Sequence, residues 1–404
     1  MNSAKRLAAA GTLFFALAAG VHAGVAPSVS SCSNGPTPSA TLLLPYFEVD
    51  LLGQDHQTTL FAVVNAGNHP TLAHVVLWTD WGVPTLAFDI YLGVNDTQTM
   101  NLRDILNGVL PVTGGTPLNG CTNPVTLPAL DATALTNLRK QHTGQANGSG
   151  NCSGSGRGGV NLATGYMTVD AAQACSATIV YPLQAGYFVA GGNGIASNEN
   201  VLLGDFFFVD AAQNYAEGNE AIHIAADAAR FGGSPSTFYG TWIGRSGDDA
   251  RAPLGTKYRA RYLTGGGFSG GTNLVVWAEP SVPTPEAVTC GHRNEFVDPC
   301  QYLRTQAFSE DAVASAQVQS NVVPQVASRM SVGVGADIPV TAPFGFVDFE
   351  NRVQPFCLAE PTGDFPLQSL VIPLHSAAGR YAVGFNAFRI ADDLCEPPVA
   401  ATAD

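Results

Sequence analysis

The chain has 404 residues, with 18 lysines and arginines against 32 aspartates and glutamates, and a formal net charge of −14 at pH 7. Binding to nucleic acid requires clustered cations that neutralise a phosphate backbone. The acidic composition therefore predicts that nucleic acid is not a partner. The excess acid favours solubility, and the alternative is that some loop carboxylates bind divalent cations.

The N-terminus has the pattern of a secretory signal peptide. Lys5 and Arg6 precede an apolar run over residues 7–20, and Val21-His22-Ala23 matches a small-x-small cleavage site. The apolar run is shorter than the roughly 20 residues that cross a bilayer, and no later stretch is long enough. We predict cleavage after Ala23 and an exported chain without a transmembrane segment, which is secreted, periplasmic or at the cell surface.

The cysteines favour a disulfide framework. All eight lie beyond the predicted cleavage site, and an even number in an exported chain points to paired thiols. We expect four disulfides and favour the pairings Cys290–Cys300 and Cys357–Cys395, because each pair brackets a single loop or hairpin. A zinc site is disfavoured because the sequence has no C-x2-C pair. The cysteines are Cys32, Cys121, Cys152, Cys175, Cys290, Cys300, Cys357 and Cys395.

The first hundred residues predict short β-strands. Residues 85–92 alternate with a period of two, which places an apolar set on one face. Further strands are expected at 41–49, 58–65, 72–81 and 97–102, with turn residues between them. Such spacing, without alternation of strands and helices, favours an all-β fold. We expect an immunoglobulin-like antiparallel β-sandwich, one large or two packed, with long disulfide-tied loops.

The stretch from Asn107 to Gly159 is rich in Gly, Thr, Asn, Ser and Pro and contains Cys121 and Cys152. It predicts an insertion tied by disulfides, with one helix near residues 130–141. We divide the chain into a signal peptide (1–23), N-terminal β-sandwich strands (24–106), a Cys/Gly-rich insertion (107–164), a β-rich region (165–280) and a C-terminal β-rich region with a disulfide loop (281–404).

The second half of the chain predicts further strands. They are expected at 201–209, 221–225, 257–263, 273–278, 328–334, 344–349, 370–374 and 381–388, with a polar stretch up to Gln319. The glycines of residues 265–271 are expected to fold 257–263 and 273–278 into a hairpin. Val-Asp-Ala-Ala-Gln occurs twice, at 169–173 and 209–213, which suggests two equivalent strand ends where Asp170 and Asp210 cap the following turn.

The sequence offers candidates for two kinds of binding, to a sugar and to calcium. Trp78 and Trp81 lie three apart on one predicted strand, so they point to opposite faces and at most one belongs to the core. The other, beside Asp80, is a candidate for an exposed ring that stacks on a sugar, although a large aromatic residue that covers a sandwich edge is the commoner arrangement. Calcium is the candidate ion at two acidic groups, because it prefers oxygen ligands. For Glu48, Asp50 and Asp55, with His56 close by, the spacing does not match a calcium-binding loop, and a solvated acidic loop is favoured. For Asp248 with Asp249, an internal ion pair is favoured over calcium.

No pattern in the sequence supplies a catalytic set. Gly267-Phe268-Ser269-Gly270-Gly271 matches a nucleophile elbow, but no helix is expected after it, so it is interpreted as a turn. Ile222-His223-Ile224 is expected to be a strand that leaves His223 half-exposed, which is poor evidence for a metal ligand.

Three segments resemble a family of exported bacterial proteins. They are Leu42 to Glu48, Thr58 to Asn65 and Ala73 to Ile90. The resemblance implies a secreted β-rich protein and carries no catalytic residue to this chain.

The expected function is that of an exported, non-enzymatic protein: a cell-surface, matrix or ligand-binding β-sandwich. Its expected partner is a cell-surface polysaccharide or another surface protein. No cofactor is expected, and calcium is the alternative. The alternatives are an extracellular hydrolase that uses carboxylate pairs, and a structural subunit that assembles through strand edges.

Overall fold

The computed structural model describes residues 36–391, except residues 54–55, 117, 119, 157, 176–178, 241–247, 266–270, 281–287, 291–299, 316, 322–325, 355–364, 378–380 and 385–386. The predicted signal peptide and Cys32 lie outside the described residues. Among the residues described, no helix is long and apolar enough to cross a membrane.

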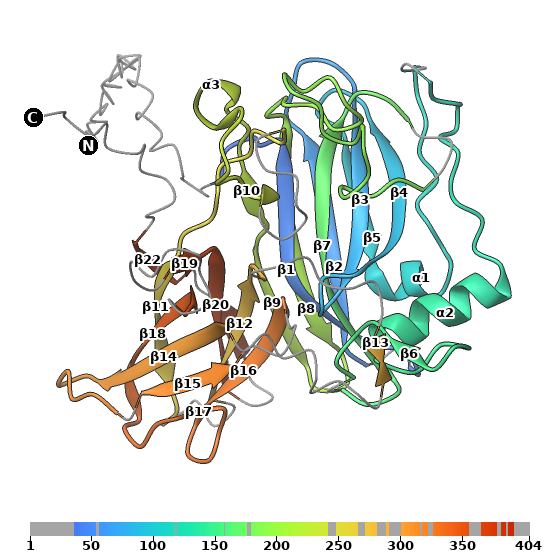
Figure 1. Ribbon diagram of the computed structural model, residues 1–404. Helices are drawn as coiled ribbons and strands as arrows, with labels where there is room; N and C mark the ends of the chain where they lie inside the picture. Colours follow the sequence, from blue (N-terminus) through green and yellow to red (C-terminus); the bar gives the residue numbers. More distant parts are fainter. Residues whose placement is uncertain are drawn as a thin grey trace, which may run out of the picture. The chain divides into compact units, whose positions relative to one another are not determined.

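The N-terminal strands form two antiparallel sheets (Figure 1). Sheet I has the order β10-β1-β7-β3-β4 and sheet II the order β5-β2-β8-β9. The strands are β1 (Thr41–Asp50), β2 (Thr58–Asn65), β3 (Thr71–Thr79), β4 (Pro84–Leu92), β5 (Thr97–Asn101), β7 (Leu162–Ala172), β8 (Leu202–Asp210), β9 (Tyr215–Glu220) and β10 (Ile222–Ile224).

The C-terminal strands form two more sheets. Sheet III has the order β15-β14-β18-β11-β22, with β19 also paired to β18, and sheet IV the order β17-β16-β12-β20-β21. The strands are β11 (Lys257–Leu263), β12 (Gly271–Ala278), β14 (Gln301–Ser309), β15 (Val318–Asn321), β16 (Ala327–Gly333), β17 (Ile338–Pro339), β18 (Phe344–Val353), β19 (Phe365–Leu367), β20 (Ser369–Ala377), β21 (Tyr381–Gly384) and β22 (Phe388–Ala391).

The sheets share one hydrophobic core. Strand β1 packs against β2 and β8 of sheet II, and β11 packs against β12 and β20 of sheet IV. Strand β1 also contacts β12 and β16, so the N-terminal and C-terminal sheets meet there. Aromatic rings run through this contact: Trp78 stacks on Tyr166 with ring centroids 5.7 Å apart, and Tyr166 meets the edge of Trp277 at 6.2 Å. A single buried cluster therefore extends across all four sheets.

The pairing of β1 with β7 is interrupted by a feature of the β1 sequence. All its residues except Asp50 are buried, and its pairing with β7 shifts register between Leu44 and Phe47. Pro45 lies at the shift and has no N–H to donate, so the ladder is interrupted there. The irregularity falls just before Glu48, which belongs to the candidate site described below.

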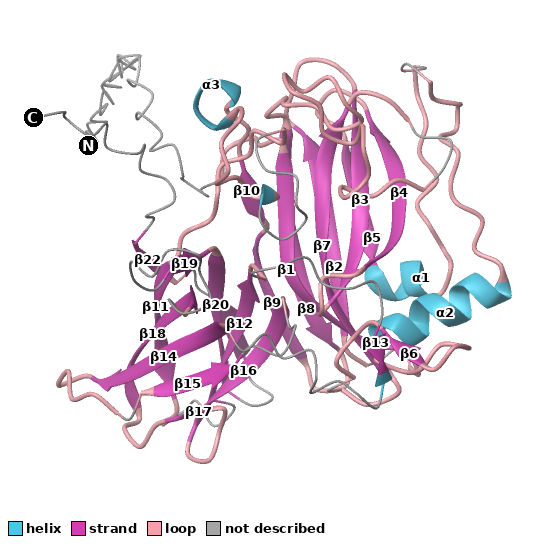
Figure 2. Cartoon of the chain, in the orientation of Figure 1, coloured by secondary structure: helices cyan, strands magenta, loops and turns pink. Residues whose placement is uncertain are grey.

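Helices are few and short (Figure 2). They are α1 (Leu102–Leu106), α2 (Ala132–His142) and α3 (Ala228–Phe231). Helix α2 confirms the helix expected near residues 130–141. The Asp131 side chain caps it by accepting hydrogen bonds from the backbone N–H groups of Thr133 and Ala134.

Disulfides tie the long insertion to distant strands. Cys121 bonds Cys175, just after β7, and Cys152 bonds Cys290 beside the ribbon of β6 (Asn151–Cys152) and β13 (Val288–Thr289). The expected pairing of Cys290 with Cys300 is therefore wrong, because the strand pairing of β6 with β13 brings Cys290 to Cys152. Cys357 and Cys395 lie outside the described residues.

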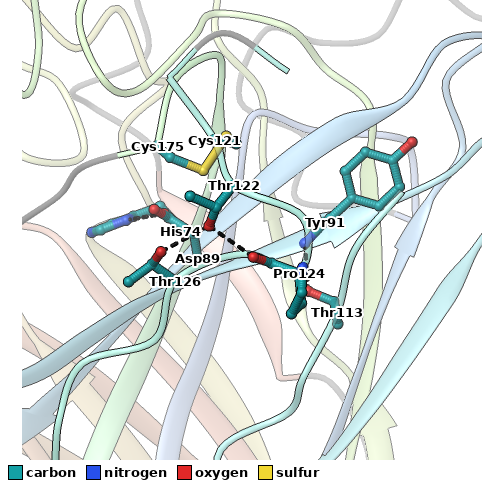
Figure 3. The surroundings of a disulfide bond; sticks show 9 residues. All are labelled: His74, Asp89, Tyr91, Thr113, Cys121, Thr122, Pro124, Thr126 and Cys175. Atoms are coloured by element: carbon teal, nitrogen blue, oxygen red, sulfur yellow. Dashed lines mark hydrogen bonds and ion pairs between the residues drawn. A yellow bond between two sulfur atoms is a disulfide. The ribbon is translucent and has the colours of Figure 1, made fainter. Parts of the chain in front are cut away.

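The Cys121–Cys175 disulfide lies close to a buried ion pair of sheet I (Figure 3). His74 Nδ1 is 2.7 Å from Asp89 Oδ1, and its Nε2 is 2.9 Å from the Val180 carbonyl oxygen. Although burial opposes the charged form, Asp89 and this carbonyl raise the pKa of His74. Both ring nitrogens face acceptors, which suits the protonated ring.

A second buried ion pair lies beside the first, because the strand register pairs Asp170 of β7 with His74 of β3, and it involves the first Val-Asp-Ala-Ala-Gln segment. Asp170 was expected to cap a turn, but it lies inside β7, is fully buried and accepts hydrogen bonds from Tyr187 and Tyr239. Arg251, also fully buried, places Nη2 3.7 Å from Asp170 Oδ1. Asp210 fits the expectation, because it ends β8 and accepts a hydrogen bond from the Gln213 backbone N–H.

Two other expectations for the second half of the chain are wrong. Strands β11 and β12 do not form a hairpin, because β11 pairs with β18 and β22 in sheet III, whereas β12 pairs with β16 and β20 in sheet IV. The stretch up to Gln319 contains strand β14, although it was expected to be polar and irregular. The all-β class is confirmed, and the immunoglobulin-like arrangement remains a prediction.

Candidate functional site

Both tryptophans proposed for ligand binding are buried. Trp78 is fully buried and Trp81 is 1% exposed, so the expectation that at most one lies in the core is wrong. Strand β3 ends at Thr79, and the period of two does not extend through the following turn to Trp81. Trp81 packs against the Cys152–Cys290 disulfide. Neither indole offers an exposed platform for a sugar ring.

Asp80, between them, is buried as well and has fixed partners. The Ser155 backbone N–H donates to its Oδ1 over 2.9 Å, and the Ser155 hydroxyl donates to its Oδ2. Thr164 of β7 donates to Oδ2 over 3.4 Å. Asp80 thereby connects the insertion to sheet I, and it also lines the cleft described next.

A cleft of about 230 Å³ lies where sheet I meets sheet IV. It brings together two residues from different predicted groups, Glu48 and Asp80, with side chains that the sequence did not single out. Its walls come from β1 and β7 on one side, and from β12 and β16 on the other. The lining residues are Tyr46, Glu48, Asp80, Ser155, Gly158, Leu162, Thr164, Asn273, Ala327, Ser328, Arg329, Ser331 and Asp337.

Glu48 is held in the cleft wall by three donors. The Tyr46 hydroxyl donates to Oε1 over 2.8 Å, and Gln57 Nε2 donates to Oε2. Arg329 of β16 reaches Oε2 from the other side of the cleft, with Nη1 2.9 Å away. Burial opposes the charge of Arg329, but Glu48 and the nearby tyrosines raise its pKa. This ion pair connects sheets I and IV.

A second carboxyl group, Glu217 of β9, lies within electrostatic range of Arg329. It is 4% exposed, and burial raises its pKa to about 7 even though Tyr215 donates a hydrogen bond to it. Arg329 therefore lies near two glutamates. The raised pKa of Glu217 favours its protonated form over a wider pH range than that of a free glutamate.

The cleft carries a net negative charge. Its three carboxylates are Glu48, Asp80 and Asp337, and Arg329 is its only cation among the described lining residues. Asp337 accepts hydrogen bonds from the Ser331 N–H and hydroxyl over 2.8 Å each. The carboxylates are thus already held by protein donors, which fixes their positions before any ligand arrives.

Two polar lining side chains are unused. The amide of Asn273 on β12 and the hydroxyl of Ser328 on β16 make no hydrogen bond to any described residue. An amide offers two donors and one acceptor oxygen, and a hydroxyl offers one donor and acceptor sites. Within the described part of the cleft, these two groups can bond a ligand without breaking an existing contact.

The calcium candidates do not assemble into a site. Glu48 is paired with Arg329, Asp50 Oδ2 lies 3.2 Å from His56, and Asp55 lies outside the described residues. Asp249 is fully buried whereas Asp248 is exposed, so they do not converge. Across the described ranges, no three His, Cys, Asp or Glu side chains gather closely enough to hold a metal ion.

The alternative of an ion pair near Asp249 is met in part. Arg251 donates to the Asp249 backbone oxygen over 2.7 Å, but the carboxylate that it pairs with is Asp170. Burial raises the pKa of the Asp249 carboxyl to about 6. His223, expected to be half-exposed, is 2% exposed and accepts a hydrogen bond from the Gly204 N–H, because β10 is covered on both faces.

Sequence reasoning missed Arg329, Asn273 and Ser328. They lie more than 200 residues beyond Glu48 in the chain, and only the meeting of β1 with β12 and β16 brings them to it. One signal was present: Arg329 is a charged residue inside a predicted apolar strand, and such a residue requires a buried partner.

Comparison with known proteins adds no relative: no family model, no curated protein and no solved structure matches the chain. The functional argument therefore depends on the chemistry of the cleft.

Proposed function

We propose that the protein is an exported, non-enzymatic β protein that binds one sugar unit of a cell-surface polysaccharide in the cleft between sheets I and IV. An immunoglobulin-like arrangement of its sheets is part of this proposal. The observation that carries it is the pair of unused polar groups, Asn273 and Ser328, in a cleft whose carboxylates are already fixed. Fixed acceptors and a free amide suit a ligand with many hydroxyl groups.

Size and charge narrow the ligand class. Pockets for drug-sized ligands measure about 300–1,000 Å³, and the cleft, at about 230 Å³, is smaller. A single sugar ring is a suitable occupant. The net negative charge of the cleft disfavours anionic sugars and favours neutral or amine-bearing ones, whose hydroxyl and amine hydrogens carboxylates accept.

The first experiment is depletion of the purified mature protein from solution by washed producer cells and by insoluble neutral polysaccharides. We expect depletion by at least one of these surfaces, and a parallel sample with a chelator tests for a calcium requirement. The test variant is Asn273→Ala/Ser328→Ala. The matched control, Gln213→Ala/Ser149→Ala, removes an exposed amide and an exposed hydroxyl outside the cleft.

The double cleft variant should bind about tenfold more weakly, because two hydrogen bonds of about 0.5–1.5 kcal/mol each are lost. The control should bind like the unmodified protein. No depletion by any surface, or equal depletion of both variants, refutes the proposal.

Glu217 favours a hydrolase as the second candidate. A protonated carboxylic acid beside an ionised one is the arrangement that glycoside hydrolysis requires. Glu217 has a pKa of about 7, and both Glu217 and Glu48 lie within electrostatic range of Arg329. It ranks second because Glu217 is not among the residues that line the cleft. Release of new reducing ends from the bound polysaccharide, abolished by Glu217→Gln, identifies the hydrolase.

A further inference from the structure

Sheet III presents a positively charged face on an acidic protein. Along β11 the buried side chains of Tyr258, Ala260 and Tyr262 alternate with those of Lys257, Arg259 and Arg261, which lie on the opposite face. The strand register places Arg304 of β14 and Arg352 of β18 near them. We call this surface the basic face, and its charged residues are Lys257, Arg259, Arg261, Arg304, Asp348, Glu350 and Arg352.

The basic face gathers five cations and two carboxylates in a chain of net charge −14. Three of the cations surround one carboxylate. Lys257 Nζ lies 2.7 Å from Glu350 Oε1, and Arg304 and Arg352 both contact Oε2. One negative charge does not neutralise three positive charges, so this point on the sheet retains a positive field.

The protonation behaviour of Glu350 agrees with such a field. Burial opposes its ionised form, but the surrounding Lys257, Arg352 and Arg304 outweigh burial and lower its pKa. The carboxylate therefore remains ionised well below neutral pH, and the excess of positive charge around it persists over the same range.

The same face contains a hollow of about 240 Å³ beside these cations. Lys257 and Arg304 line it together with the carboxylates Asp348 and Glu350, the amides of Gln306 and Gln317 and the ring of Phe308. Phe308 stacks on Phe346 with ring centroids 4.8 Å apart, and the Arg259 guanidinium lies 4.2 Å above the Phe346 ring. An aromatic surface thus adjoins cationic and amide donors.

We propose that the basic face binds a uronic acid residue of an acidic polysaccharide, at a site separate from the cleft. The carboxylate of such a sugar pairs with lysine and with the planar fork of arginine. The hydroxyl groups suit the glutamine amides, and the apolar face of the ring packs on Phe308. An acidic peptide offers carboxylates but no flat ring for the aromatic surface, so the sugar fits the hollow better.

The test is titration of the full mature protein with oligogalacturonate and oligoalginate, at low and high salt. The methyl ester of oligogalacturonate has the same backbone without the charge. We expect binding that weakens with salt and at least tenfold weaker binding of the ester. The variant Lys257→Gln/Arg304→Gln should lose at least tenfold in affinity, and the control Lys140→Gln/Arg230→Gln, which removes two cations elsewhere, should change it less than twofold.

The fold of the test variant is checked by its urea midpoint, because Glu350 keeps Arg352 as a partner and partly exposed ion pairs contribute little to stability. No binding of either uronate oligomer, equal binding of the ester, or equal losses in both variants overturns the proposal. Polyglutamate or single-stranded DNA bound as tightly as oligogalacturonate also overturns it, because general attraction of polyanions is then sufficient. The cleft variant Asn273→Ala/Ser328→Ala should bind oligogalacturonate normally, so the two proposals fail separately.

Discussion

Replacement of Arg251 by methionine tests how much the buried ion pair between Arg251 and Asp170 contributes to stability. Arg251 and Asp170 are both fully buried, and Arg251 donates from Nε to the Thr41 hydroxyl over 2.8 Å. It also donates from Nη1 to the Asp249 oxygen over 2.7 Å and from Nη2 to the Ser197 oxygen over 2.9 Å. Methionine fills much of the space but supplies no charge and no donor.

The expected loss is about 3–5 kcal/mol in the free energy of unfolding, because removing one partner leaves the other charge buried without compensation. Equilibrium urea unfolding, followed by tryptophan fluorescence, measures it. The control is Arg259→Met, which breaks an ion pair with Asp348 whose arginine side chain is 42% exposed. That change should cost about 0.2–1 kcal/mol.

Removal of both buried charges completes the cycle. Asp170→Asn in the Arg251→Met background should recover part of the loss, because the uncompensated carboxylate is then gone. A loss for Arg251→Met that is no larger than that for Arg259→Met refutes the reasoning, since the buried pair then behaves like an exposed one.

Further predictions concern pH and covalent links. Burial raises the pKa of Glu217 from 4.5 to about 7, so the folded chain binds the extra proton. The free energy of unfolding should fall by about 3 kcal/mol as pH rises from 4.5 to about 7. Urea unfolding at pH 5 and pH 8 measures this decrease, which should be absent from the Glu217→Gln variant. Burial lowers the pKa of His142 from 6.5 to about 4. The free energy of unfolding should therefore fall as pH drops from 6.5 to 4. If His142→Gln loses the same free energy of unfolding over this range as the unmodified protein, the prediction is contradicted. The disulfide Cys152–Cys290 closes a separation of 138 residues. The variant Cys152→Ser/Cys290→Ser should therefore lose about 2–5 kcal/mol in the free energy of unfolding and change the fluorescence of Trp81. An unchanged thermal unfolding temperature contradicts this prediction.

Local patterns in the sequence predicted much of the strand content. Residues 58–65 and 257–263 form β2 and β11 with the expected bounds, because apolar and β-branched residues bounded by turn residues carry a local signal. Strand β14 was missed because its Arg304 and Gln306 lie on the basic face, and polar residues there conceal the buried alternate positions.

The candidate site was only partly predictable for a different reason. Glu48 and Asp80 were singled out separately, but their neighbours Asn273 and Arg329 come from strands of another sheet. Which strands meet is decided by packing over the whole chain, and no local pattern records it. The burial of Trp81 has the same origin, because its cover is a disulfide formed by Cys152 and Cys290.

Two of the ladders join strands that lie far apart in the chain. Thr41 of β1 pairs with Asp170 of β7, and Ala278 of β12 pairs with Ser369 of β20, so each ladder waits for a strand synthesised about a hundred residues later. High contact order slows folding and leaves strand edges open to aggregation in the meantime. A chain that stays unfolded during synthesis depends on chaperones, and it is also in the state that can thread through a translocation pore.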